Sequence, residues 1–187
     1  MIKPLILASA SLRRRQLLLE MGVPFEVVVT EAAEILLPDK PEATVRANAL
    51  SKLTWCMERH PGRSIIAADT VIDMDGHCIG KPGSISEATE FLKAFSGRVH
   101  AVLTGVAMVE PGSKPCVKTV RSMVTFKSLT ESEIAKYFRV VNPLDKAGAY
   151  DINQNVEMII EKYEGSFTNI VGLPMETVYE WLKHSRT

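Results

Sequence analysis

The chain has 187 residues, of which 46% are hydrophobic and 24% are charged, so it can build a core and is not wholly disordered. We expect one domain over residues 1–187. The 22 basic side chains balance the 22 acidic ones, and aromatic residues make up only 6%, which argues against a nucleic-acid-binding protein with a basic or base-stacking surface.

Hydrophobic periodicity divides the chain into strands with apolar runs and helices with 3.6-residue spacing. In chain order, the patterns predict a strand over 2–8, a helix over 12–21, a strand over 25–29, an acidic loop over 31–42, a helix from 41 or 42 to about 60, strands over 64–73 and 77–79, a helix over 84–96, strands over 99–109 and 116–126, a helix over 130–138, a loop over 142–154, a strand over 156–163 and a helix over 175–184.

Turn and cap signals place some of these boundaries more firmly. The turns at 75–76 and 110–113 predict antiparallel hairpins, so we expect a mixed sheet in an α/β or α+β fold. Two helix starts carry a Ser or Thr followed three residues later by Glu, which predicts capping boxes at Ser84 with Glu87 and at Thr130 with Glu133.

The cysteines and the N-terminal segment bear on where the protein works. Cys56, Cys78 and Cys116 are odd in number, widely spaced and without a CxxC pair, so we expect free thiols. No apolar run is long enough to span a membrane, and the short run before Arg13 does not resemble a signal peptide. We therefore expect a cytoplasmic protein.

The segment Ser9–Arg14 is the first candidate site. It joins a predicted strand to a helix N-terminus, where free N–H groups and the positive end of the dipole favour phosphate. Arg13 and Arg14 are unfavourable for the first turn of the helix itself, but their guanidinium groups could bind phosphate oxygens. Taken alone, the segment is equally well explained as a solvated basic face after a serine N-cap.

Asp69 is the second candidate, because it lies inside the apolar strand 65–71. A carboxylate there is costly unless it is paired or binds a metal, and metal binding or general-base catalysis would explain it. A local hydrogen bond at a strand end is an equally good explanation. Glu34, Lys52 and Lys81 are by themselves best read as solvated charges, on a loop, a helix and a loop respectively.

Seven short blocks occur together along the chain. They are Ser-x-Ser-x-Arg-Arg-x-x-Leu-Leu at 9–18, Ala-Asp-Thr-Val at 68–71, Gly-Lys-Pro at 80–82, Ser-Gly-x-x-His at 96–100, Thr-Gly at 104–105, Asp-Lys-Ala-Gly-Ala-Tyr at 145–150 and Asn-x-Val-Gly-Leu-Pro at 169–174. In this order they resemble the Maf family of nucleoside triphosphate pyrophosphatases. The resemblance implies an α/β fold like that of the inosine-triphosphate pyrophosphatases, with a long mixed sheet flanked by helices and two lobes around a cleft.

The resemblance also implies an activity, the hydrolysis of a nucleoside triphosphate to the monophosphate and pyrophosphate with a divalent metal, Mg²⁺ or Mn²⁺. By the same resemblance, the phosphates would be held by Ser9, Arg13, Arg14, Lys52 and Lys81. Asp69 and Glu34 would bind the metal, with Asp69 as the base that activates water. Thr70, Asn153 and Gln154 would contact the substrate, and a homodimer is usual for the family.

The blocks at 68–71 and 145–150 are similar to those of the dTTP/UTP branch, so a pyrimidine triphosphate is the expected substrate. Preference for 7-methyl-GTP is an alternative within the enzyme class. A nucleotide-binding regulator of septum formation with little catalysis is an alternative of another class. The segment 151–154 departs from the family pattern: Asn153 replaces a glutamine, with Gln154 beside it, and Asp151 adds a negative charge that could weaken nucleotide binding.

Overall fold

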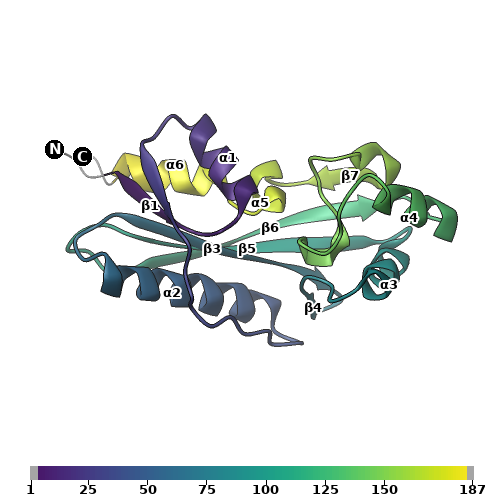
Figure 1. Ribbon diagram of the computed structural model, residues 1–187, viewed down its shortest axis with the longest axis horizontal. Coiled ribbons are helices and arrows are strands. Elements are labelled where there is room, and N and C mark those ends of the chain that lie inside the picture. The colour runs from purple at the N-terminus through teal and green to yellow at the C-terminus, as the bar shows by residue number, and fades with distance from the viewer. Residues whose placement is uncertain (1–3, 185–187) are drawn as a thin grey trace.

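The computed structural model describes residues 4–184. Its strands and helices follow in the order β1 (Leu5–Ala8), α1 (Leu12–Glu20), β2 (Phe25–Val28), α2 (Pro41–Arg59), β3 (Ile65–Met74), β4 (His77–Ile79), α3 (Ile85–Phe95), β5 (Val99–Val109), β6 (Cys116–Phe126), α4 (Glu131–Phe138), β7 (Ile160–Glu164), α5 (Phe167–Val171) and α6 (Met175–His184) (Figure 1). The beginning of the predicted first strand, at residues 2 and 3, lies outside the described residues.

The strands form one mixed seven-stranded sheet in the order β2-β1-β3-β5-β6-β7, with β4 paired to β3. β1 runs parallel to β2 and β3, whereas the β3–β5, β5–β6 and β6–β7 pairs are antiparallel. The central strands are long because β5 and β6 each span 11 residues. The predicted α/β class with a long mixed sheet flanked by helices is confirmed.

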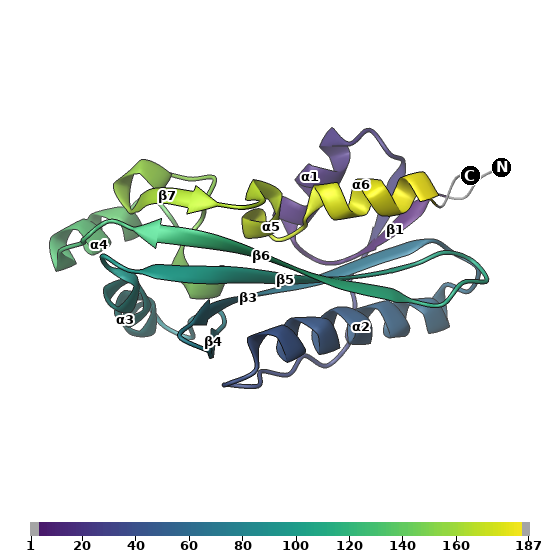
Figure 2. The ribbon, with the colours of Figure 1, turned by 180° about the vertical axis from the view of Figure 1, so that it is seen from behind.

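The helices cover this sheet unequally. At the end of the long strands near β1, α2 lies on one face of the sheet, and α1, α5 and α6 lie on the other (Figures 1 and 2). α3 and α4 gather with β7 at the opposite end of the long strands. The helices therefore form two groups that share one continuous sheet.

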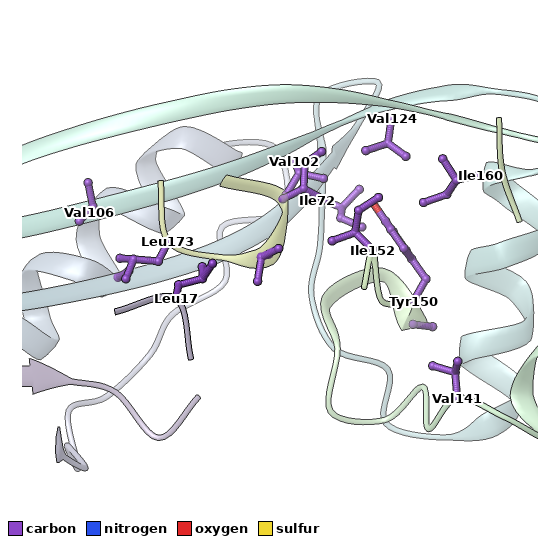
Figure 3. Packing of buried hydrophobic residues seen from close by; sticks show 14 of the residues in the cluster. Leu17, Ile72, Val102, Val106, Val124, Val141, Tyr150, Ile152, Ile160 and Leu173 are labelled. Carbon is purple, nitrogen blue, oxygen red and sulfur yellow. The ribbon is translucent and has the colours of Figure 1, made fainter. Parts of the chain in front are cut away.

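Each face of the sheet buries its own apolar side chains. The face under α2 packs Ile6, Ala67 and Ala107 against Ala49 and Leu53. The other face carries the larger cluster, in which side chains from the sheet meet those of α1 and of the C-terminal segment (Figure 3). Figure 3 also shows Tyr150 and Ile152 of the loop before β7 pointing toward the same cluster.

Gly105 lets α2 lie close against the sheet. A Cβ atom at this position would stand 2.4 Å from the carbonyl oxygen of Val45 and 3.0 Å from the backbone nitrogen of Arg46. Gly105 is paired in register with Asp69 on β3. Because Gly105 has no side chain, α2 can lie close to Asp69, the candidate residue on β3.

Most predicted boundaries agree with the structure, and the departures are local. Thr130 and Glu133 form the predicted reciprocal capping box. Ser84 caps α3, but the carboxylate of Glu87 accepts from the backbone N–H of Gly83 instead, so the second box is incomplete. β7 begins at Ile160 and not at 156, because Asn155 is left-handed and a 3₁₀ turn follows it. The five-residue helix α5 was not predicted.

The structure also bears on the expected free thiols and on the question of a membrane span. Cys56 is buried and free, and Cys78 and Cys116 are half-buried and free. Burial raises the pKa of the Cys56 and Cys78 thiols. Among the described residues, no helix is long and apolar enough to cross a membrane.

His100 lies in an aromatic cluster between the sheet and the loop before β7. Its Nε2 is 2.9 Å from the hydroxyl of Tyr150, and its ring packs 4.5 Å from that of Phe95, centroid to centroid. Burial lowers the pKa of His100 from its ordinary 6.5 to about 4, so the folded protein holds a neutral imidazole there. Burial likewise raises the pKa of Tyr150.

We expect stability to fall as the pH drops from 7.5 to 5. The unfolded chain takes up a proton on His100 near pH 6.5, whereas the folded chain resists it until about pH 4. This linkage should cost about 2 kcal/mol of unfolding free energy at pH 5. Urea unfolding at both pH values measures it, and His100→Phe should flatten the difference by that amount. An unchanged difference in His100→Phe would contradict the assignment.

Candidate active site

The carboxylate of Asp69 is held from both sides where β3 passes under α2. Its Oδ1 lies 2.8 Å from Nζ of Lys52, and its Oδ2 accepts a 2.9 Å hydrogen bond from Nδ2 of Asn48. Asn48 and Lys52 are one helical turn apart on α2 and therefore share a face. All three side chains are buried, so the carboxylate has a fixed orientation.

Glu34 completes this arrangement from the loop before α2. Its Oε1 lies 2.7 Å from Nζ of Lys52, so one ammonium group bridges two carboxylates. Burial alone would raise the pKa of Glu34, but its hydrogen bond to Lys52 and the charges of Lys52, Lys81 and Arg14 leave the pKa below its usual value. Lys81 is exposed, and its charge acts on the same carboxylate.

The loop that carries Glu34 is fastened by Asn48. The side-chain oxygen of Asn48 accepts from the backbone N–H of Ile35 at 2.8 Å, and its Nδ2 lies 2.9 Å from the carbonyl oxygen of Ile35. One amide thus connects the Glu34 loop to Asp69. Asn48 was not among the residues predicted from the sequence, although its position four residues before Lys52 was a usable signal.

The guanidinium of Arg14 donates most of its hydrogen bonds to protein oxygens. Its Nε donates to the carbonyl oxygen of Gly172 at 2.7 Å, and its Nη2 donates to the hydroxyl of Thr70 at 3.0 Å. Its Nη1 reaches the carbonyl oxygen of Ala68 at 2.8 Å and the hydroxyl of Ser9 at 3.3 Å. Burial lowers the pKa of Arg14, although the nearby negative charge of Asp69 acts to raise it.

Within residues 4–184, these four contacts leave Arg14 with one of its five N–H donors uncommitted. The guanidinium joins the turn after β1, the middle of β3 and the residue after α5. Ser9 and Thr70, which were predicted to contact the substrate, are two of its partners, and Ser9 is itself buried. The phosphate-binding role of Arg14 stays a prediction, and the contacts establish that it organises the site.

Arg13 is the more accessible of the two arginines. Its Nη1 pairs with Oδ2 of Asp151 at 3.3 Å, and about a third of its side chain is exposed. Asn153 and Gln154 follow Asp151 in an exposed stretch of the same loop. The backbone N–H of Asn153 donates to Oδ1 of Asp151, so this turn is organised by the aspartate. Substrate contact by Asn153 and Gln154 stays a prediction.

A divalent metal fits this donor set only with help from a ligand. Among residues 4–184, no group of three or more His, Cys, Asp or Glu side chains could hold a metal ion. Glu34 and Asp69 nevertheless converge on one cation, the ammonium of Lys52. Two carboxylates are enough for Mg²⁺ where substrate phosphates and water supply the remaining oxygens.

The fold has a counterpart among solved structures. The Staphylococcus aureus Ham1 protein superposes with a TM-score of 0.55, at 12% identity, over 97% of this chain and 99% of its own. This similarity assigns the chain to a class of fold, the α/β proteins with a long mixed sheet of the Ham1 kind.

The amino-acid sequence of this chain is similar to those of one protein family. Residues 4–185 match the family described as Maf-like protein. A dTTP/UTP pyrophosphatase of Thermotoga maritima is 42% identical over 180 residues, which cover 95% of this chain and 87% of that protein. A dTTP/UTP pyrophosphatase of Akkermansia muciniphila is 39% identical over 184 residues, with coverage of 97% and 96%. The chain belongs to the Maf family.

Proposed function

We propose that this protein is a hydrolase that converts dTTP and UTP to the nucleoside monophosphate and pyrophosphate. The observation that carries the proposal is the buried carboxylate of Asp69, fixed by Lys52 and Asn48 and adjoined by Glu34. Membership in the Maf family supports the reaction class, and the relatives named dTTP/UTP pyrophosphatase support the pyrimidine substrates.

In the proposed reaction, the oxygen of a water molecule attacks the α-phosphorus. The bond from this phosphorus to the oxygen that bridges it to the β-phosphorus breaks, and pyrophosphate leaves. Asp69 accepts the proton of the water. Each oxygen of Asp69 accepts one hydrogen bond from Lys52 or Asn48 and keeps a free lone pair, so the carboxylate is oriented without being saturated.

The positive side chains balance the charge of the triphosphate. Arg13 and Lys81 are exposed enough to reach phosphate oxygens, and Lys52 adds charge beside Asp69. We propose that Glu34 and Asp69 hold a divalent cation, Mg²⁺ or Mn²⁺. When bound, such a cation neutralises phosphate charge and makes a bound water more acidic.

The cysteines and the family membership bear on the cellular location and the oligomeric state of the protein. We propose a cytoplasmic enzyme, which is supported by the three free thiols. The resemblance to the Maf family supports a homodimer, and light scattering of the purified protein would test the mass.

The test of the proposed function is pyrophosphate release by purified protein with Mg²⁺ or Mn²⁺. The panel contains dTTP, UTP, CTP, ITP and 7-methyl-GTP. We expect dTTP and UTP to give the highest kcat/KM. Preference for 7-methyl-GTP would keep the reaction and overturn the substrate. Nucleotide binding without turnover of any triphosphate would overturn the enzyme and favour the regulator of septum formation.

A further inference from the structure

Asp151 is a buried carboxylate between two cations. Its Oδ2 lies 3.3 Å from Nη1 of Arg13 and 3.9 Å from Nζ of Lys146. Only 3% of its side chain is exposed, and its Oδ1 accepts from the backbone N–H of Asn153 at 2.9 Å. The pair with Arg13 joins α1 to a loop 138 residues later in the chain.

The loop holds Asp151 in place. Tyr150 and Ile152, the residues on either side, are buried in the cluster that Figure 3 shows. The backbone N–H of Asp151 donates to the hydroxyl of Tyr137 at 3.0 Å. The backbone of Asp151 is therefore fixed, and the hydrogen bond from Asn153 holds its carboxylate beside Arg13.

Arg13 is the movable partner of this pair. It reaches Asp151 through a long side chain that is about one-third exposed, on the first turn of α1. Four of the five N–H donors of Arg14 form hydrogen bonds to protein oxygens. Of the two arginines at the proposed phosphate site, Arg13 is therefore the one that an incoming anion can recruit.

We propose that Asp151 is an affinity-determining residue that competes with the triphosphate for Arg13. The proposal rests on the proposed function, and it names Asp151 as a residue that lowers the affinity of the enzyme for its substrate. Without nucleotide, the carboxylate neutralises Arg13 and keeps it turned toward the loop. A phosphate that binds Arg13 must take the place of this carboxylate in its contact, so part of the phosphate's binding energy is lost in breaking the pair.

The test variant is Asp151→Asn. Asparagine keeps the side-chain oxygen that accepts from Asn153, but it removes the charge that attracts Arg13. Lys146 retains its contacts with Asp145 at 2.6 Å and with the carbonyl oxygen of Asn142 at 3.0 Å, so it keeps a counterion. We expect the KM for dTTP to fall about fivefold with kcat within twofold, because one charge-assisted contact no longer has to be broken.

Binding is measured separately from turnover, by calorimetry with a non-hydrolysable α,β-imido analogue of dTTP. The analogue should bind Asp151→Asn about fivefold more tightly than the wild type. Asp145→Asn is the matched control, because Asp145 forms its ion pair with Lys146 and acts on Arg13 only through its charge. This variant should bind the analogue within twofold of the wild type.

A double-mutant cycle with Arg13→Gln asks whether Asp151 acts through Arg13. In the Arg13→Gln background, Asp151→Asn should leave the affinity unchanged. An unchanged or weaker affinity in Asp151→Asn, or an equal gain without Arg13, would overturn the proposal, and the cycle decides the matter even if the single variant is less stable. Failure of the proposed function would appear differently, as absent dTTP hydrolysis by the wild type.

Discussion

Asp69→Asn is expected to lower kcat for dTTP hydrolysis about 10³-fold, the range for loss of a general base. The amide has the shape of the carboxylate, but it cannot accept the proton of the attacking water. Asparagine also loses the ionic contact with Lys52, while Glu34 still pairs with that ammonium. The affinity for the imido analogue of dTTP should therefore change less than tenfold. Single-turnover pyrophosphate release and calorimetry measure the two quantities.

Asp73→Asn is the matched control on the same strand. Asp73 is as buried as Asp69, at 9% against 8% exposed, and pairs with Arg121 at 2.8 Å. Its other oxygen accepts from the backbone N–H of Gly76, so its contacts lie in the β3–β4 turn and on β6, away from Lys52 and Asn48. We expect kcat of Asp73→Asn within twofold of the wild type. More than a tenth of wild-type kcat in Asp69→Asn would contradict its role as the base.

Gly105→Ala is expected to cost about 3 kcal/mol of unfolding free energy, at the upper end for overpacking. The added methyl group would lie 2.4 Å from the carbonyl oxygen of Val45, which is backbone and cannot rotate away. α2 must then move off the sheet, and it carries both Lys52 and Asn48. The activity should fall as well, because these two side chains orient Asp69. Urea unfolding and kcat measure the two effects.

Gly80→Ala controls for the change of glycine to alanine itself. The nearest atom to an added Cβ there is the side-chain Cδ1 of Leu36 at 3.8 Å, an ordinary contact. We expect this variant to unfold within about 0.5 kcal/mol of the wild type. Equal stabilities for the two variants would show that α2 does not depend on the missing side chain at Gly105.

The fold was predictable where turn residues clearly bound a long strand. β5 and β6 begin and end at the predicted residues, because two long segments rich in β-branched residues lie on either side of a Pro-Gly turn. The start of β7 was wrong because Val156 and Met158 suit a strand, while the left-handed Asn155 directs the chain into a 3₁₀ turn. α5 has only five residues, too few for a helical period to stand out.

The candidate site was predictable in its members but not in its connections. The apolar context of Asp69 indicated a carboxylate that needs a partner, and the structure supplies Lys52 and Asn48. Arg14 donates hydrogen bonds to the carbonyl oxygens of Ala68 on β3 and of Gly172. The sequence could not show this, because both partners are distant from Arg14 along the chain. For the same reason, the sequence indicated a new charge at Asp151 without showing that Arg13 would neutralise it.

The most direct test of the proposed reaction is to run dTTP hydrolysis in ¹⁸O-labelled water and to analyse both products by mass spectrometry. Attack of water on the α-phosphorus beside Asp69 predicts one ¹⁸O atom in thymidine monophosphate and none in pyrophosphate. Label in pyrophosphate would contradict attack at the α-phosphorus, and products that are dTDP and inorganic phosphate would contradict the proposed function of this site.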